Sequence, residues 1–378
     1  MSSGGHKKHA EVIRPTYGSF AITGGRCDDI KALASRLIEA LPQYRCGYAD
    51  AHHAKPGDTV FLPGRLQEGA AVEYSFEGPY HQLNFTGSFN DFQKRAAFQS
   101  CDLVFINGNH FEASAQILIL DPLKKESLKK RLSQLHSIQL ILRTDPSMEP
   151  FDFLQPILPA NVPIYNLSDT ENIVDFFRQQ MQSRLPKLQG LVLAGGKSIR
   201  LGRDKSKLVW HQKEQRYHLA DLLQEFCASV HISCRPEQAG EINEPYQPLP
   251  DTFLNLGPYG AILSAFRSAP DSAWLVLACD LPLLNRESLQ HLTSHRNASS
   301  SATAFESPRD GSPEPLVAIW EPKSYPLLLN LLSQGITCPR KALLSTFTHL
   351  IPSLNPHFLL NVNSPSDEAL ARGLINQE

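Results

Sequence analysis

The sequence predicts an α/β protein with open, mostly parallel sheets. Short apolar runs alternate with amphipathic stretches along all 378 residues, and alternating strands and helices produce such sheets. Several runs are apolar on both faces, as strands are when helices cover both sides of a sheet. Two runs lead directly into a Gly-Gly pair, Gly24-Gly25 and Gly195-Gly196. Both pairs are interpreted as turns between a strand and a helix.

The expected strands are the apolar runs, and the expected helices are the amphipathic stretches between them. In the first half the strands span residues 17–23, 102–107, 116–120, 138–142 and 162–165. In the second half they span residues 188–193, 230–234, 274–279, 302–305, 316–320 and 358–362. Residues 29–41 place their apolar side chains on one stripe of a helix. Ser168 and Glu171 form a capping-box pattern that opens a helix reaching about residue 181.

The chain length suits two or three domains. A predicted helix ends just before Pro186, and a new strand starts at residue 188. We therefore expect two domains, residues 1–185 and residues 186–378.

Composition excludes several classes of function. Lys plus Arg number 36 and Asp plus Glu number 38, a net charge of −2, so no overall field attracts nucleic acid or an anionic membrane. No apolar run approaches the ~18 residues that span a bilayer, and the first residues lack the apolar stretch of a secretory signal. The seven cysteines are dispersed and form no CxxC pair. This usage favours a reducing cytoplasm.

The most informative stretch follows the predicted strand at residues 188–193. Glycines at Gly195-Gly196 let backbone N–H groups approach an anion closely. Arg200, Arg203, Lys205 and Lys207 add four cations within eight residues. Close backbone and fixed cations are what a triphosphate requires. The alternative is a glycine turn with a solvated basic face. The stretch is not a Walker A loop, because GxxxxGK[ST] is absent.

Asp280 is the candidate metal ligand. It ends the apolar run at residues 274–279 and is followed by Pro282. The carboxyl ends of parallel strands face the ligand crevice, and one or two carboxylates commonly hold Mg²⁺ beside phosphate oxygens. Asp280 would otherwise cap the next helix, but Asn285 is better placed for that.

Two further segments carry weaker signals. Asp251 precedes Gly257 and Gly260, which open a predicted helix. Its carboxylate suits a ribose hydroxyl or a base N–H, although a loop turn explains the segment equally well. Asn361 and Asn363 follow the last predicted strand, where they either bind a polar ligand or cap the helix starting near residue 366.

These four pieces, in this order, resemble the molybdenum cofactor guanylyltransferases. The similarity extends from about residue 188 to the C-terminus. The opening motif of the family, LAGGxSxRxGxDK, matches at Leu193, Ala194, Gly195, Gly196, Ser198, Arg200, Gly202, Asp204 and Lys205. Its later motifs match at Asp251, Gly257, Pro258, Gly260, Cys279, Asp280, Pro282, Asn361, Asn363, Pro365 and Asp367.

The resemblance implies a Rossmann-like nucleotidyltransferase fold that moves GMP from GTP to the phosphate of molybdopterin with Mg²⁺ and releases pyrophosphate. From their charge and position we expect Arg200, Lys205 and Asp280 to be the catalytic residues, with Asp280 on the metal. Expected ligand contacts are Leu193, Ala194, Gly195, Gly196, Lys205, Asp251, Gly257, Gly260 and Asp280, with Asn361 and Asn363 on the pterin side. One departure is that the family's Asn after its second strand is absent from Ile232-Ser-Cys-Arg235.

Three alternatives stay open at this point. The first is a molybdopterin transferase that uses CTP, and the second is a transferase that acts on a sugar phosphate. The third is a non-catalytic scaffold that binds nucleotide.

The first half resembles the P-loop adaptor of molybdopterin-guanine dinucleotide biosynthesis. The similar segments are residues 50–53, 68–71, 102–108 and 164–167. Aligned to the P-loop, however, Ile30 replaces the phosphate-binding lysine, and Asp28 and Asp29 place carboxylates beside the phosphate position. Losing the charged contact alone costs about 1.5–3 kcal/mol. We expect a degenerate P-loop-type α/β domain without productive GTP binding. Its expected role is docking, dimerisation, or contact with cofactor-delivering or molybdoenzyme partner proteins.

Overall fold

A computed structural model describes residues 18–51, 64–195 and 204–376. The chain divides into two compact units, Met1–Ser183 and Arg184–Glu378. Each contains a sheet with helices on both faces, so the predicted α/β class is confirmed. Within the described ranges, no helix combines the length and apolar character needed to cross a bilayer.

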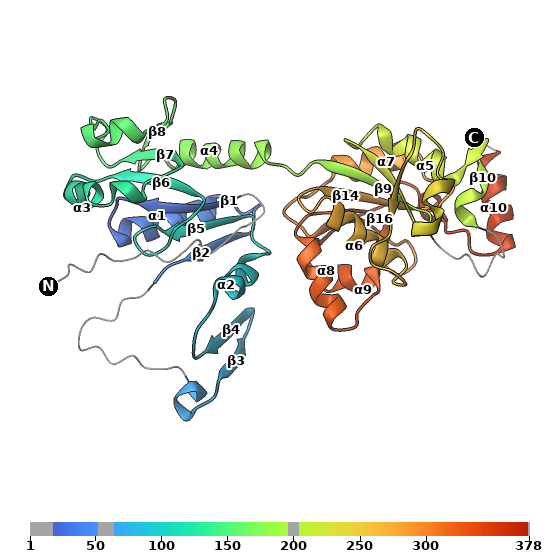
Figure 1. Ribbon diagram of the computed structural model, residues 1–378, viewed down its shortest axis with the longest axis horizontal. Helices are drawn as coiled ribbons and strands as arrows, with labels where there is room; N and C mark the ends of the chain where they lie inside the picture. Colours follow the sequence, from blue (N-terminus) through green and yellow to red (C-terminus); the bar gives the residue numbers. More distant parts are fainter. Residues whose placement is uncertain (1–17, 52–63, 196–203, 377–378) are drawn as a thin grey trace. The chain divides into compact units, whose positions relative to one another are not determined.

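The first unit is built on a six-stranded sheet in which every pair of neighbouring strands is parallel. The spatial order is β2-β5-β1-β6-β7-β8 (Figure 1). The strands are β1 (Gly18–Thr23), β2 (Cys46–Ala49), β5 (Leu103–Asn107), β6 (Ala115–Leu120), β7 (Ile138–Arg143) and β8 (Ile164–Asn166). The helices are α1 (Cys27–Ala40), α2 (Asp91–Phe98), α3 (Lys125–Lys129) and α4 (Thr170–Ser183).

Aromatic side chains pack helix α4 against one face of the first sheet. Phe177 of α4 meets Phe20 of β1 and Phe105 of β5 edge-on, with ring centroids 5.1 and 5.2 Å apart. Helix α1 buries Ile30, Leu33 and Leu37 on the stripe that the sequence predicts.

The first unit also contains an antiparallel hairpin outside the main sheet. Its strands are β3 (Val72–Glu77) and β4 (Tyr80–Phe85), joined by Gly78-Pro79. Gly78 has φ of +58°, which suits a two-residue hairpin turn that begins with glycine.

The second unit contains a seven-stranded, mostly parallel sheet in the order β13-β12-β9-β14-β16-β15-β17. Only the pairings of β16 with β14 and β15 are antiparallel. The strands are β9 (Leu188–Leu193), β12 (Val230–Cys234), β13 (Gln247–Pro250), β14 (Ala273–Ala278), β15 (Ala302–Glu306), β16 (Pro313–Trp320) and β17 (Thr348–Ile351).

Helices cover both faces of this sheet in three layers (Figure 1). One face packs against α5 (Gln215–Gln224) and α7 (Arg286–Ser294) through residues such as Leu223 and Leu289. The other packs against α6 (Pro258–Ser268), α8 (Ser324–Ser333) and α9 (Pro339–Leu344). The final helix, α10 (Pro365–Ile375), packs through Ala371 against the small hairpin of β10 (Val209–Trp210) and β11 (Lys213–Glu214).

The strand predicted at residues 358–362 is wrong. Pro356–Leu359 form a 3-10 turn, and extended chain follows. Phe358, Leu359 and Val362 are buried. An apolar run of this length arises equally from a buried strand and from a buried turn, so periodicity alone misassigned it.

The predicted cap of α4 is displaced by one residue. The Asn172 backbone N–H donates to Asp169 Oδ1 at 3.2 Å, so Asp169, rather than Ser168, caps the helix. The predicted cap of α7 is confirmed, because the Ser288 N–H donates to Asn285 Oδ1 at 3.0 Å.

Candidate functional site

Three parallel strands bring the predicted segments to one edge of the second sheet. In the register of the sheet, Leu193 of β9 lies opposite Ser233 of β12 on one side and Ala278 of β14 on the other. The chain leaves β9 through Ala194 and Gly195, and it leaves β14 through Cys279 and Asp280. This edge is the carboxyl end of the three strands, where open α/β sheets bind ligands.

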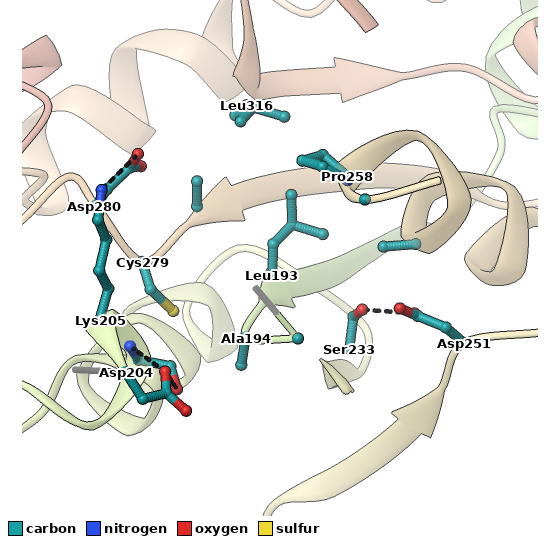
Figure 2. A pocket seen from close by; sticks show the side chains of 15 residues that line it. Leu193, Ala194, Asp204, Lys205, Ser233, Asp251, Pro258, Cys279, Asp280 and Leu316 are labelled. Carbon is teal, nitrogen blue, oxygen red and sulfur yellow. Dashed lines mark hydrogen bonds and ion pairs between the residues drawn. The ribbon is translucent and has the colours of Figure 1, made fainter. Parts of the chain in front are cut away.

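A pocket of about 260 Å³ lies at this edge. Figure 2 shows Leu193 and Ala194 in its centre, with Asp280 and Lys205 at one end and Asp251 at the other. Its lining includes seven predicted site residues: Leu193, Ala194, Gly195, Lys205, Asp251, Gly257 and Asp280. Gly196 and Arg200 lie outside the described residues.

Lys205 joins segments that are far apart in the sequence. Its Nζ donates to Asn363 Oδ1 at 2.7 Å and lies 3.8 Å from Asp280 Oδ2. The Lys205 side chain is 17% exposed, so bulk water screens its charge only partly. The ammonium group therefore stands as a fixed cation between two predicted ligand-binding segments.

Asp280 has one carboxylate oxygen without a hydrogen-bond partner. Oδ1 is buried and receives no donor from the described residues. Burial raises the pKa of this carboxyl, while Lys205 acts in the opposite direction. A buried, unsatisfied acceptor is costly, and a cation placed beside it would remove that cost.

The donor set at Asp280 fits Mg²⁺, because that ion takes oxygen ligands and commonly uses one or two carboxylates with phosphate and water. The described residues contain no cluster of three or more His, Cys, Asp or Glu side chains that would form a complete protein cage. A metal held at Asp280 would thus depend on ligand oxygens for much of its coordination.

Asp204 fixes the turn that presents Lys205. Its Oδ1 accepts hydrogen bonds from the Ser206 N–H at 3.0 Å and from Ser206 Oγ at 2.7 Å. It thereby caps the 3-10 turn Lys205–Lys207. Asp204 belongs to the opening motif, and the structure shows how this residue orients its neighbour.

Asp251 occupies the other end of the pocket. Its backbone N–H donates to the Cys234 carbonyl at 2.8 Å, and Ser233 Oγ donates to its Oδ1, also at 2.8 Å. Burial raises the pKa of Asp251 to about 6, and the Ser233 hydrogen bond opposes this shift. Ser233 was missed in the sequence, because a serine within a strand gives no signal of the carboxylate that it meets.

Two of the predicted glycines, Gly195 and Gly260, differ in their surroundings. A Cβ on Gly195 would meet protein atoms only at ordinary contact distances, Asp251 Oδ2 and Arg235 N among them at 3.5 Å. A Cβ on Gly260 would lie 2.2 Å from the Phe253 carbonyl oxygen. Gly260 is buried and does not line the pocket. Its missing side chain is explained by packing within the fold rather than by the expected nucleoside contact.

Asn361 and Asn363 line a neighbouring pocket of about 240 Å³, which also includes Arg340 and Leu316. Leu316 borders both pockets. The Val362 N–H donates to the Asp280 carbonyl at 2.8 Å, which ties this segment to the end of β14. Arg340 lies 3.3 Å from Glu314. It was missed because a single arginine on a short helix gives no local signal.

In the first unit, the space beside the Gly-Gly turn is occupied by residues of β6. A Cβ on Gly24 would lie 2.5 Å from the Ile119 carbonyl oxygen, and one on Gly25 would lie 2.9 Å from Ile119 Cδ1. The absent side chains of Gly24 and Gly25 thus make room for β6. The expectation that this unit does not bind GTP productively stays a prediction.

Comparison with known proteins identifies the second half. Residues 190–348 match the MobA-like NTP transferase domain. A molybdenum cofactor biosynthesis bifunctional protein of Synechocystis is 35% identical over 181 residues, which are 48% of this chain and 52% of that relative. The chain thus spans about half the length of that protein. A probable molybdenum cofactor guanylyltransferase of Carboxydothermus hydrogenoformans is 30% identical over 184 residues, which are 47% of this chain and 90% of that relative.

The chain belongs to the molybdenum cofactor guanylyltransferase family. The predicted family and enzyme class, a nucleotidyltransferase, are therefore confirmed. Among solved structures, the MobB protein homolog of Bacillus stearothermophilus is similar with a TM-score of 0.31 and 15% identity, covering 44% of this chain and 98% of that one.

At the position where guanylyltransferases of this family usually have an Asn after the second strand, this chain has Cys234 and Arg235. The structure puts the Ser233 hydroxyl and the Arg235 backbone N–H near Asp251 and Gly195, respectively. Both donors are engaged within the protein, since the Ser233 hydroxyl donates to Asp251 Oδ1 and the Arg235 N–H donates to Gln238 Oε1 at 3.2 Å.

Proposed function

We propose that the pocket at the carboxyl edge of β9, β12 and β14 binds GTP and Mg²⁺ and transfers GMP to the terminal phosphate of molybdopterin, releasing pyrophosphate. The observation that supports this most directly is the position of Lys205. Its ammonium group contacts the candidate metal ligand Asp280 and the candidate acceptor-side residue Asn363. A cation there is placed to bind charge on both reacting ligands.

The nucleotide would occupy the larger pocket. Leu193, Ala194 and Gly195 line this pocket and would lie beside the expected triphosphate, and Gly196 and Arg200 would complete that loop. Asp251, at the far end, would accept hydrogen bonds from the N–H groups of guanine. Cytosine lacks the paired N–H edge of guanine, so this assignment favours GTP over CTP.

The acceptor would occupy the pocket of Asn361, Asn363 and Arg340. Amide groups suit the polar edge of a pterin, and an arginine suits a phosphate. Leu316 lines both this pocket and the nucleotide pocket, so the two are adjacent.

The chemistry requires alignment and charge stabilisation more than proton transfer. The nucleophile is a phosphate oxygen that is already anionic, so no general base is needed. Asp280 would hold Mg²⁺, which when bound supplies positive charge to the phosphate oxygens. Lys205 would stabilise negative charge on the α-phosphate, and Arg200 would stabilise the leaving pyrophosphate. Fixed cations in a partly dehydrated site act most strongly where charge develops.

Pyrophosphate release tests this proposal. The full chain is incubated with molybdopterin, Mg²⁺ and either GTP or CTP. We expect release with GTP that depends on molybdopterin and Mg²⁺, and little release with CTP. Faster release with CTP would identify a cytidylyltransferase. Nucleotide binding without release under any condition would identify a scaffold.

We keep two further predictions with this proposal. The free, dispersed cysteines favour a cytoplasmic location. Contacts with cofactor-delivering proteins or molybdoenzymes are expected for an enzyme whose product is a protein-bound cofactor.

The pH dependence of GTP binding should report the ionisation of Asp251. Its pKa is raised to about 6, so the carboxylate is ionised at pH 7.5 and becomes protonated as the pH falls through 6. Protonation removes an acceptor for guanine, and the KM for GTP should rise below pH 6. In the Asp251→Asn variant the KM should already be high at pH 7.5 and should lack this step. Steady-state assays from pH 5 to 8 measure the KM for GTP in the wild type and in Asp251→Asn. If the KM of the variant still rises below pH 6 as it does in the wild type, Asp251 is not the group that titrates.

Two glycine variants separate ligand contact from packing. Gly195→Ala should leave the melting temperature nearly unchanged, because its Cβ meets ordinary contacts, but it should raise the KM for GTP about tenfold. Gly260→Ala should destabilise the fold by about 1–3 kcal/mol, because its Cβ would collide with the Phe253 carbonyl oxygen. Thermal unfolding and steady-state kinetics on both variants test this. A wild-type KM in Gly195→Ala would show that the nucleotide does not approach this backbone.

A further inference from the structure

Three neighbouring strands of the first sheet lead into chemically reactive side chains. Cys27 follows β1 and begins α1, Asp50 follows β2, and His110 follows β5. These strands are parallel and lie in the order β2-β5-β1 (Figure 1), so the three side chains meet at the carboxyl edge of the sheet. We call them the thiol cluster. The proposed nucleotidyl transfer uses none of them.

His110 Nε2 faces both other members of the thiol cluster. It lies 3.8 Å from Cys27 Sγ and 3.6 Å from Asp50 Oδ1. The side chains of His110 and Asp50 are 11% and 8% exposed, whereas Cys27 is only partly buried and can meet a reagent from solvent. A histidine beside a cysteine can take the thiol proton and thereby activate the sulfur as a nucleophile.

Asp50 is held in its ionised form. Burial raises its pKa, but the hydrogen bonds that it accepts from the Ala51 N–H at 2.8 Å and the Tyr48 hydroxyl at 3.0 Å act in the opposite direction. The charges of His110 and Lys31 also favour the carboxylate, and the net effect is a lowered pKa. An ionised Asp50 stabilises the proton that His110 would take from Cys27.

Asn109 connects the sulfur to two buried donors that lack an acceptor. Its Nδ2 donates to Cys27 Sγ at 3.6 Å, its Oδ1 accepts from Arg131 Nη1 at 3.1 Å, and its backbone N–H donates to Asn107 Oδ1 at 3.1 Å. Within the described part of the chain, Arg131 Nε and Asn107 Nδ2 are buried without a partner, and Asn107 has no exposed surface. Unpaired buried donors are costly. A small ligand with carbonyl or carboxylate oxygens would supply the missing acceptors.

The first unit has no second thiol at this edge. Its other cysteines, Cys46 and Cys101, are both described and lie at the amino ends of β2 and β5. Cys46 is four residues before Asp50, and four residues of extended chain span roughly 13 Å. A disulfide requires Cα atoms within about 7 Å. A disulfide partner for Cys27 would therefore come from outside the first unit.

We propose that Cys27 is a site of thiol–disulfide exchange with a small disulfide of a cysteine-containing peptide, and that His110 is its base. His110 Nε2 takes the thiol proton, and the Cys27 sulfur attacks one sulfur of the disulfide. A bond forms between these two sulfurs, and the original S–S bond breaks. The released sulfur takes the proton from His110 and leaves as a thiol. Cys27 is thereby oxidised to a mixed disulfide, and half of the small disulfide is reduced.

The rate of modification at each cysteine of the full, reduced chain tests this inference. Oxidised glutathione at neutral pH is the probe, and peptide mass spectrometry follows Cys27 and Cys338. Cys338 is the matched control, because it is exposed and also lies at the start of a helix but forms no hydrogen bond to a histidine within the described residues. Cys27 should gain one glutathionyl group at least tenfold faster than Cys338, the low end of what a positioned base provides.

Two variants separate the base from the ligand contacts. His110→Gln should slow the reaction at Cys27 at least tenfold and leave the rate at Cys338 unchanged. Arg131→Gln should slow the reaction of Cys27 with oxidised glutathione about threefold or more. It should leave the reaction with 2-hydroxyethyl disulfide unchanged, because that disulfide has no carbonyl or carboxylate oxygen.

Three outcomes would overturn the inference. Equal rates at Cys27 and Cys338 in the wild type exclude an activated thiol, and this comparison decides the matter even if His110→Gln does not fold. A wild-type rate at Cys27 in His110→Gln excludes His110 as the base. Equal slowing of both disulfides in Arg131→Gln excludes the proposed ligand class. Nucleotidyl transfer is not measured, so failure of the proposed function would leave these results unaffected.

Discussion

Replacing Lys205 by alanine should reduce turnover by about 10²–10³-fold, or roughly 3–4 kcal/mol of transition-state stabilisation. The ammonium group lies 3.8 Å from Asp280 and 2.7 Å from Asn363, so its removal takes the fixed cation from between the proposed donor and acceptor sites. Lys205→Gln tests whether the charge matters, because glutamine keeps a donor for Asn363. We expect both variants to lose turnover while far-UV circular dichroism stays unchanged.

Lys207 is the matched control for Lys205. It lies in the same 3-10 turn, but its Nζ pairs with Glu241 at 2.7 Å and the side chain is exposed. Lys207→Ala should retain activity within about threefold, since an exposed ion pair contributes little. Equal losses in the Lys205 and Lys207 variants would point to a diffuse basic loop and would remove Lys205 from the reaction.

Replacing Asp280 by asparagine should lower turnover at least 10²-fold and raise the Mg²⁺ concentration needed for half-maximal activity. The amide has the shape of the carboxylate but lacks its charge. Burial raises the pKa of Asp280, because removing a charged carboxylate from water costs free energy that a neutral amide does not incur. Stability should therefore be unchanged or higher in Asp280→Asn. Pyrophosphate release across a Mg²⁺ titration, together with thermal unfolding, measures both effects.

Asp271→Asn is the control for Asp280. Asp271 is exposed and precedes β14, at the opposite end of that strand. It should have wild-type kinetics and an unchanged Mg²⁺ requirement. If Asp280→Asn responds to Mg²⁺ as the wild type does, another group holds the metal.

The site residues at the carboxyl edge of the second sheet were predictable from sequence, because each is marked by a pattern within a short stretch of the chain. A buried strand followed by glycines marks residues 193–195, and a buried strand followed by a carboxylate marks Asp280. Parallel pairing then brings both strand ends to one edge. The seven predicted residues that line the pocket belong to such strand ends or to the turn and helix start beside them.

The remaining parts depend on contacts between distant segments. Ser233 acquires its role only through the 2.8 Å hydrogen bond to Asp251, and Arg340 through the neighbouring pocket. Gly24 and Gly195 look alike in sequence, but one is packed by Ile119 and the other borders a pocket. The β3–β4 hairpin did have a local signal, since apolar and polar residues alternate on both sides of Gly78-Pro79.

Leu316 is a wall shared by the two pockets, and this has a kinetic consequence for the proposed enzyme. In the proposed arrangement each substrate would contact only one side of Leu316, whereas the dinucleotide product would extend across it and keep contacts in both pockets. Its dissociation breaks two sets of interactions at once, so its departure is expected to be slower than that of either substrate. Transfer of the product to a receiving protein would then be the rate-limiting step of turnover.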